Sequence, residues 1–310
     1  MRFSLLLGIL IPLLAFLAAF LYWSDKSLVT TRYTLRSAAV GRSFDGFTIV
    51  HVSDLQSARF GPDQRRLAKA VRRASPDIIV FTGDLVDRNH TDYQASLKAM
   101  EQLTAIAPVY YVNGNHELAL PQNGILQMYD AMSDMGVHML FDRSETICRG
   151  QDRMVLLGIS EETLYTAKGV RPGDGQPSRT DTAFDTSVIT EAAEELTEDL
   201  LTEDLAVLVV HEPQYLDAYV QGAGGRIDLI FAGHAHGGQI RLPFTQGLFA
   251  PGQGVMPKLT SGVHQRGKTA MVISRGLGNS TFPFRVFNRP EIVTCRLEST
   301  GCKASGGQKQ

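Results

Sequence analysis

The chain has 310 residues, of which 44% are hydrophobic and 20% charged. These proportions are typical of a globular protein and exclude disorder, collagen and coiled coil as the overall class. Thirty Lys and Arg residues against 32 Asp and Glu give a formal net charge of -2 at pH 7, so we expect no nucleic-acid partner. The three cysteines lie far apart and form no CxxC pair, which argues against a disulfide framework and against a structural zinc cluster.

The amino-terminal segment has the properties of a membrane helix. Residues 3–23 contain no charged side chain, and as a helix they would span roughly 31 Å, about the thickness of a bilayer's hydrocarbon core. A cleaved signal peptide is the alternative, but the apolar run is long and no clear small-residue cleavage site follows it. We therefore expect residues 1–26 to be an uncleaved, single-pass anchor in the cell membrane. The flanking charges mildly favour a cytoplasmic domain, although export machinery can override that bias, so the side of the membrane stays open.

The remainder of the chain alternates short apolar runs with helical patterns, which is typical of an α/β domain. The runs are apolar almost throughout, as expected of strands that are covered on both faces. They span residues 47–50, 78–81, 109–112, 155–159, 206–210, 227–231, 270–273 and 292–297. We predict one folded domain over residues 46–298, a linker over residues 27–45 and a disordered tail over residues 299–310.

Five of the predicted strands end beside residues that can bind metals. These residues are Asp54, Asp84, the pair Asn115 and His116, His211, and the pair His234 and His236. In open α/β sheets the ligand crevice lies outside the carboxyl ends of the strands, so these side chains should converge. One such residue alone is usually a cap or a satisfied polar group, but five strand ends together predict a site. Imidazole, carboxylate and amide donors suit Mn²⁺, Fe²⁺ or Zn²⁺, and they are too many for one tetrahedral ion.

These residues belong to an ordered set of motifs: Asp54, GDLVD from Gly83, GNHE from Gly114, His211, and GHAH from Gly233. The set resembles that of the calcineurin-like metallophosphoesterases, and the match runs from about residue 47 to residue 297. The stretches GGQIRLPF (237–244), APGQG (250–254), SRGLGNS (274–280) and FNRPEI (287–292) resemble the membrane-anchored bacterial branch of that superfamily.

The resemblance implies a four-layer α/β/β/α sandwich of two mixed sheets and a hydrolase of phosphoric esters that uses two divalent metal ions. It implies that Asp84 bridges both ions and that a hydroxide bridging the metals attacks phosphorus. Asp54 and His236 would bind the first ion, and Asn115, His211 and His234 would bind the second. It also implies that His116 is catalytic and donates a proton or a hydrogen bond to the leaving oxygen.

Gln56 departs from the family pattern, which has Asp-x-His in the first motif. The glutamine side-chain oxygen can bind a cation but is a harder donor than imidazole, so we expect weaker binding of the first metal and a preference for oxygen-seeking ions. His51 lies three residues from Asp54 on a strand and should face the other way, so it is not a replacement. An alternative function is a catalytically weakened, membrane-tethered metal-binding scaffold. Metal-dependent amide hydrolysis is a further alternative, disfavoured because the HxH pair follows the Asp motifs.

Three arginines are candidates for binding substrate: Arg88, Arg241 and Arg275. For Arg88 we favour an ion pair at the surface over contact with phosphate, whereas structural salt bridges explain Arg241 and Arg275 equally well. Because an anchor concentrates the domain at a membrane, and because the branch resembled includes proteins likened to hydrolases of lipid-linked pyrophosphates, we expect a phosphoester or pyrophosphate substrate with a lipid or cell-envelope connection. The sequence does not separate monoester from diester, and it leaves the oligomeric state open.

Overall fold

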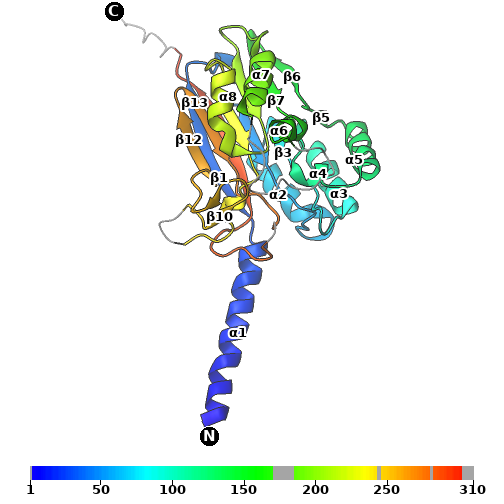
Figure 1. Cartoon of the computed structure of the whole chain (residues 1–310), viewed down its shortest axis with the longest axis vertical. Helices are drawn as coiled ribbons and strands as arrows, with labels where there is room; N and C mark the ends of the chain where they lie inside the picture. The colour runs from blue at the N-terminus through cyan, green and yellow to red at the C-terminus, as the bar shows by residue number, and fades with distance from the viewer. Residues whose placement is uncertain (1, 170–184, 243–245, 280–281, 302–310) are drawn as a thin grey trace, which may run out of the picture.

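The computed structural model describes residues 2–169, 185–242, 246–279 and 282–301. A long amino-terminal helix, α1 (Arg2–Lys26), projects from an α/β domain that contains all the other elements (Figure 1). Within α1, residues Gly8–Lys26 are long and apolar enough to cross a membrane. Their large apolar side chains are exposed rather than packed against the domain, as expected of a membrane span and not of a core helix.

Two six-stranded mixed sheets form the centre of the domain. The first has the order β1 (Val29–Ser37), β14 (Glu291–Ser299), β2 (Thr48–Val52), β3 (Ile78–Thr82), β4 (Val109–Val112) and β5 (His138–Met139). The second has the order β12 (Gly262–Arg266), β13 (Thr269–Ile273), β9 (Leu229–Ala232), β8 (Leu205–Val209), β7 (Asp152–Gly158) and β6 (Arg143–Arg149). Neighbouring strands are parallel except in the pairs β14–β2, β12–β13 and β6–β7. A small hairpin pairs β10 (Phe249–Ala250) with β11 (Gly254–Val255).

Helices cover the outer face of each sheet. The helices on the first sheet are α2 (Arg65–Ala74), α3 (Tyr93–Thr104) and α5 (Gln122–Asp134), and those on the second are α6 (Glu161–Ala167), α7 (Thr186–Thr197) and α8 (Leu216–Gly222). The inner faces pack on each other through side chains such as Val80, Val112, Val207 and Phe231. The result is the predicted four-layer α/β/β/α sandwich. Each predicted strand is present because both of its faces are buried, which produces the continuous apolar runs.

Strand β1 lies within the segment that we expected to be a linker. It pairs in parallel with β14 from Val29 opposite Glu291 to Ser37 opposite Ser299. Its sequence, VTTRYTLRS, alternates partly buried with exposed positions, because β1 is an edge strand with one solvent-facing side. The alternation of Thr and Arg resembles a polar connector, which is why the sequence predicted a linker. Pairing with β14 shows that residues 29–37 belong to the sheet. Of the expected disordered tail, residues 302–310 lie outside the described residues.

The register of the first sheet places the carboxyl ends of β2, β3 and β4 on the side of the sheet where α1 leads into β1. Val293 of β14 lies opposite His51 of β2, and Glu291 lies opposite Val29, which follows α1 closely in the chain. Because β2 runs antiparallel to β14, the carboxyl end of β2 is at the same edge as the start of β1. Strands β3 and β4 run parallel to β2, so their carboxyl ends also lie at this edge.

Candidate metal centre

Polar residues from both sheets converge at the carboxyl ends of the strands. The backbone N–H of His234, after β9, donates to Asp54 Oδ1, after β2, at 3.0 Å. Nε2 of His211 lies 3.2 Å from Asn115 Oδ1 and 3.4 Å from Asp84 Oδ2. All these side chains are buried. The structure therefore brings together Gln56, which the family pattern pointed to, and the residues that we predicted from the strand ends: Asp54, Asp84, Asn115, His116, His211, His234 and His236.

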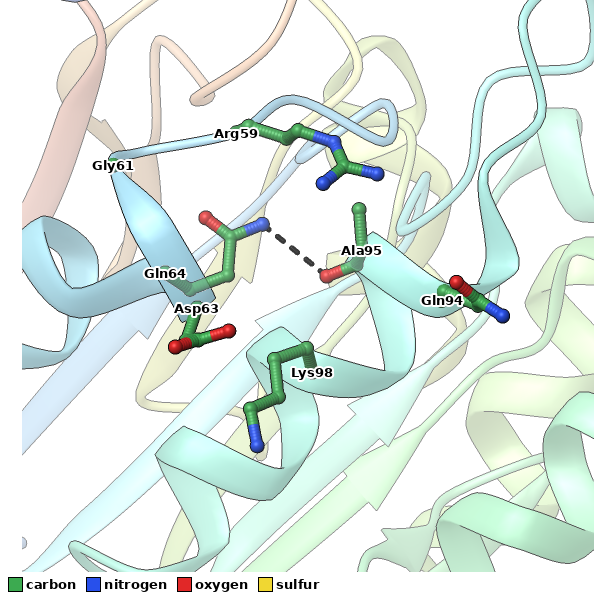
Figure 2. Close-up of a pocket in the computed structure, with 7 residues that line it drawn as sticks. All are labelled: Arg59, Gly61, Asp63, Gln64, Gln94, Ala95 and Lys98. Carbon is green, nitrogen blue, oxygen red and sulfur yellow. Dashed lines mark hydrogen bonds between the residues drawn. The ribbon is translucent and has the colours of Figure 1, made fainter.

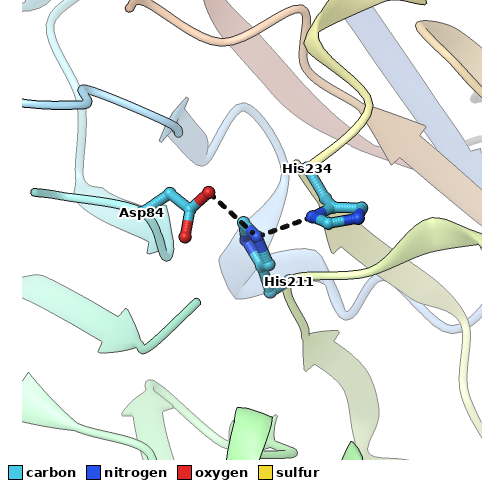
Figure 3. A group of neighbouring side chains, drawn as sticks. All are labelled: Asp84, His211 and His234. Carbon is cyan, nitrogen blue, oxygen red and sulfur yellow. Dashed lines mark hydrogen bonds and ion pairs between the residues drawn. The ribbon is translucent and has the colours of Figure 1, made fainter. Parts of the chain in front are cut away.

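Within this cluster, two groups of three could each hold a metal ion. One consists of Asp84, His211 and His234, and the other of Asp54, Asp84 and His236; in each, the potential ligand atoms lie within 4.8 Å of one another. Figure 3 shows the first group, in which the His211 ring lies between the Asp84 carboxylate and the His234 ring. Asp84 belongs to both groups. This arrangement suits a carboxylate that is shared between two neighbouring cations.

Backbone carbonyls orient two of the imidazoles. Nδ1 of His211 lies 2.7 Å from the carbonyl oxygen of Thr82, and Nδ1 of His236 lies 3.3 Å from that of Gly278. When neutral, a ring that donates from Nδ1 to a carbonyl has its lone pair on Nε2. In both residues Nε2 points into the cluster, 3.4 Å from a carboxylate oxygen of Asp84 or Asp54. The two rings are thus held in the orientation that a metal ligand needs.

The electrostatics of the cluster favour cation binding. Burial lowers the pKa of His234 to about 4 and lowers that of His236 well below its usual range, so both imidazoles are neutral near pH 7. Burial raises the pKa of Asp54 to about 6. Burial opposes ionisation of Asp84 as well, but the neighbouring His211 and His116 hold the pKa of its carboxyl low. The charges of Asp84 and Asp54 raise the pKa of His211 well above its usual range against the effect of burial, and a metal ion would take the place of that proton. Two buried carboxylates beside the neutral imidazoles of His234 and His236 are a site that a cation would stabilise.

Gln56 lies inside this cluster. Its Nε2 donates to Asp84 Oδ2 at 2.7 Å, while its Oε1 is buried and has no hydrogen-bond partner among the described residues. An unpartnered buried oxygen typically costs about 1–3 kcal/mol. A buried oxygen without a partner, on a side chain that contacts the Asp84 carboxylate, is available to bind a cation, so the side chains present fit divalent metal ions.

The residues that carry the site have unusual backbone conformations. Positive φ angles occur at Asp54 (52°), Gln56 (51°), Asp84 (53°), His234 (64°) and His236 (46°). For residues other than glycine this left-handed conformation costs roughly 1 kcal/mol or more each, and such strain concentrates at functional sites. The surrounding sheets must therefore hold these turns in place.

Glu117 is an important residue of the site whose role the motifs did not reveal. Its Oε2 accepts hydrogen bonds from the backbone N–H groups of Asp84, at 3.0 Å, and Gly114, at 2.7 Å. Its Oε1 accepts one from Val86 at 3.1 Å. The buried carboxylate thus ties the loop after β3 to the loop after β4. The available signal was the spacing of a helix capping box, with Glu117 three residues after Gly114.

A second glutamine, Gln64, stabilises the loop that carries Gln56. Its Oε1 accepts from the Phe60 N–H at 2.8 Å, and its Nε2 donates to the carbonyls of Ala58, at 2.8 Å, and Ala95, at 3.2 Å. Figure 2 shows the last bond at the wall of a surface pocket. The pocket is lined by Arg59, Gly61, Asp63, Gln64, Gln94, Ala95 and Lys98, none of which is a predicted site residue. The pocket is therefore separate from the metal centre.

His116 lies between two carboxylates. Its Nε2 is 3.9 Å from Asp84 Oδ2, and its Nδ1 is 3.4 Å from Asp87 Oδ1 and 3.2 Å from the backbone N of Arg88. Burial opposes protonation of His116, but the charge of Asp84 and the hydrogen bond to Asp87 raise its pKa above the usual value. The ring is thus suited to donating a proton beside the cluster.

The three candidate arginines have different surroundings. Arg275 Nη2 pairs with Glu291 Oε1 at 2.9 Å, and Arg241 Nη1 donates to Ser261 Oγ at 2.7 Å and to the Gly237 carbonyl at 3.1 Å. Both therefore have structural partners. The surface ion pair that we favoured for Arg88 is absent from the part of the chain that the structure describes, and its backbone N–H donates to His116 Nδ1 at 3.2 Å.

An α/β/β/α sandwich with this donor set at its strand ends defines a metal-dependent phosphoesterase. The model of the calcineurin-like phosphoesterase family matches residues 47–238, and the chain belongs to that family. It is 28% identical to the uncharacterized metallophosphoesterase YkuE of Bacillus subtilis, over 90% of this chain and 88% of the relative. It is 23% identical to the phosphodiesterase YaeI of Escherichia coli, over 81% of this chain and 82% of the relative. A dimetal phosphatase from Danio rerio, known from its crystal structure, is 14% identical with a TM-score of 0.43, over 75% of this chain and 88% of that one.

Family membership makes the chain a hydrolase of phosphoesters that depends on divalent metal ions. The family region begins just before β2 and ends at Gly238, so it contains every residue of the metal centre described above. The strands after it, β12 to β14, complete both sheets.

Proposed function

We propose that this chain is a two-metal phosphoesterase, anchored in the cell membrane by α1, that hydrolyses a phosphoester or pyrophosphate bond of a lipid-linked or cell-envelope substrate. The observation that carries the two-metal proposal is the pair of potential ligand groups that share Asp84. A single tetrahedral ion would leave several of these buried donors without a partner.

In this proposal Asp84 would bind both ions. Asp54, Gln56 and His236 would hold the first, and Asn115, His211 and His234 would hold the second. The imidazole-rich donor set favours Mn²⁺, Fe²⁺ or Zn²⁺. When bound, two such ions supply positive charge to the phosphate oxygens and lower the pKa of a water so that it can attack phosphorus.

The protein's own groups would assist the leaving oxygen. Contacts with Asp84 and Asp87 favour protonation of His116, and the ring can give a proton or a hydrogen bond to that oxygen. Such assistance is typically worth roughly 10²- to 10⁴-fold in rate. Arg88 follows Asp87 and is the candidate among the three arginines for contacting phosphate oxygens, because the other two are held by structural partners.

A lipid-linked substrate is supported by the short path between the metal centre and α1. Asp25, near the end of α1, accepts hydrogen bonds from Arg285 N at 2.8 Å and Asn279 Nδ2 at 3.2 Å. In the same segment, Gly278 N donates to the carbonyl of Asp54 at 2.7 Å. The metal-bearing edge of the sheets therefore lies beside the end of the candidate membrane span.

The two-metal proposal is tested with the full chain in detergent, supplied with Mn²⁺ and with p-nitrophenyl phosphate or its bis ester. We expect Asp84→Asn to lose roughly 10³-fold in activity, because neither metal would keep its shared carboxylate. Bound metal, measured by elemental analysis, should fall as well. Asp63→Asn removes an exposed carboxylate outside the site and is the matched control.

The same assay separates the alternatives. No metal-dependent release from either ester, nor from a lipid-linked phosphate ester in vesicles, would favour a membrane-tethered metal-binding scaffold. Equal turnover of soluble and lipid-linked esters would contradict the membrane substrate while leaving the phosphoesterase proposal intact.

A further inference from the structure

Large apolar side chains are exposed on one particular part of the domain. Outside α1, all of those exposed in the described residues, except Leu126 and Leu201, belong to residues 242–287. Six of them lie on two segments: Phe249, Val255 and Met256 at the β10–β11 hairpin, and Phe282, Phe284 and Phe287 before β14. We call the five most exposed of these, which are all except Phe249, the apolar collar. Scattered single apolar residues are normal on a surface, but a concentration of this kind marks an interaction site.

Two collar residues are exposed in spite of a strained backbone. Met256 has φ of 54° with 58% of its surface exposed, and Phe287 has φ of 52° with 60% exposed. A left-handed backbone is unfavourable for a bulky residue, and burial of the side chain in the core does not offset that cost at either position. Exposed apolar side chains on a strained backbone are consistent with a partner outside the domain.

The collar adjoins the end of α1. The Phe287 ring lies 5.2 Å from the ring of Phe20 in α1. Between Phe284 and Phe287, Arg285 donates its backbone N–H to Asp25 at 2.8 Å. In Figure 1 the hairpin that contains β10 lies at the end of the domain from which α1 emerges. The collar therefore lies at the depth where α1, if embedded, would leave the membrane.

Cationic side chains surround the same point. The Arg289 guanidinium lies 4.9 Å from the ring centre of Trp23 and donates to the Ser27 carbonyl at 2.9 Å. Arg66, on the basic helix α2, donates to the carbonyl of Lys26 at 2.7 Å. Arginines beside tryptophan and exposed phenylalanines match the headgroup region of a bilayer, where amphipathic rings and basic groups accumulate.

We propose that the apolar collar is a membrane-contacting surface. It inserts into the headgroup region of the bilayer around α1 and holds the metal centre close to the membrane. The inference rests on the proposed membrane anchoring by α1. A lipid surface is the partner because the collar is continuous with the span: once α1 is inserted, the nearest apolar phase is the bilayer itself.

Backbone hydrogen bonds connect the two collar segments to the metal centre. In the segment before β14, the backbone N–H of Leu277 donates to the Asp54 carbonyl at 3.2 Å. From the hairpin, Leu248 N donates to the carbonyl of Gly238, next to His236 and Gly237, at 3.0 Å. Both collar segments are thus tied to turns that carry proposed ligands of the first metal. A collar in the headgroup region would present this site to phosphate groups at the membrane surface.

The test uses the full chain in vesicles of phosphatidylcholine and phosphatidylglycerol, with or without bromine on the acyl chains, because bromine quenches nearby tryptophan. Trp23 is the only tryptophan, so the unmodified chain reports the insertion of α1. In a Trp23→Phe background, Phe284→Trp reports whether the collar contacts lipid.

Leu201→Trp is the matched control, since Leu201 is 46% exposed and Phe284 43%. Leu201 precedes β8 and therefore lies at the opposite end of the strands from the metal centre. Because interfacial residues lie about 5–10 Å into the headgroup boundary, we expect the Phe284→Trp emission to shift to the blue and to lose about half its intensity. The control should not change.

Three outcomes would overturn the proposal. If Trp23 is quenched but Phe284→Trp is not, the collar does not contact lipid, although α1 is inserted. If neither is quenched, the proposed lipid contact of the collar and the proposed insertion of α1 are both wrong. If the Phe284→Trp emission depends on protein concentration and not on bromine, a second copy of the chain covers the surface instead. Should Phe284→Trp fail to fold, Val255→Trp probes the other collar segment, where the side chain is 76% exposed.

Discussion

At the scale of single residues, Gln56 is the position at which this chain departs from its family. Its amide donates to Asp84 and leaves an oxygen buried without a partner among the described residues. The side chain therefore both orients the shared carboxylate and offers one hard oxygen donor. Whether that oxygen replaces the imidazole of the family pattern stays a prediction.

Gln56→His should strengthen binding of the first metal ion. Imidazole is a better donor than an amide oxygen for ions such as Zn²⁺, so we expect affinity at the weaker site to rise by about tenfold or more. Competition with a chromogenic chelator measures it. Gln94→His adds a histidine at an exposed position nearby and should leave the affinity unchanged. If Gln56→His behaves like this control, Gln56 is not a ligand.

At the scale of elements, the loops after β3 and β4 act as one unit because Glu117 joins them. Three backbone N–H groups, of Asp84, Val86 and Gly114, donate to one carboxylate. The close approach also explains Gly114: a Cβ there would lie 2.6 Å from the backbone nitrogen of Asp84. The shared metal ligand is thus positioned by the partner loop as well as by its own strand.

Glu117→Gln should loosen this unit. An amide can accept on only one oxygen, so at least one buried N–H would lose its partner, at a cost of about 1–3 kcal/mol in the free energy of unfolding. Because the misplaced loop carries Asp84, we also expect metal affinity to fall by roughly 10- to 100-fold. Guanidinium unfolding and metal titration measure the two effects. Glu101→Gln, on the exposed face of α3, is the control, and equal behaviour of the two variants would refute the role of Glu117.

At the scale of the whole molecule, His51 lies in the core between the two sheets. It is on β2, its ring lies 5.1 Å from that of Phe231 on β9, and its Nε2 is 2.8 Å from Thr82 Oγ1. His51 belongs to neither of the two potential ligand groups. Burial lowers the pKa of His51 to about 3. Between that value and the unfolded pKa of about 6.5, the unfolded chain binds a proton that the folded chain does not.

Stability should therefore fall as the pH drops below about 6.5, and His51 should contribute about 2 kcal/mol of that loss at pH 5. In His51→Gln the difference in unfolding free energy between pH 7 and pH 5 should be smaller by that amount, while other buried histidines keep the rest of the slope. Guanidinium melts of the full chain in detergent at both pH values measure it. His90→Gln, at an exposed position, should show the original pH dependence. An unchanged slope in His51→Gln would contradict this account.

The sequence by itself determined the buried strands and the donor residues that follow them. Strands that are covered on both faces must be apolar throughout, so their ends are visible locally, and the turns after them carry Asp54, Asp84 and His211. The family motifs added the order of the donors. These features are local, which is why a pattern along the chain suffices to find them.

Only the tertiary structure decided how distant segments meet. It placed β1 in the sheet, gave Arg241 and Arg275 structural partners, and turned the metal-bearing edge toward the end of α1. Each of these depends on pairing between segments far apart in the sequence, such as Val29 with Glu291. No local pattern specifies such a partner, because register and packing are set by the burial of whole faces.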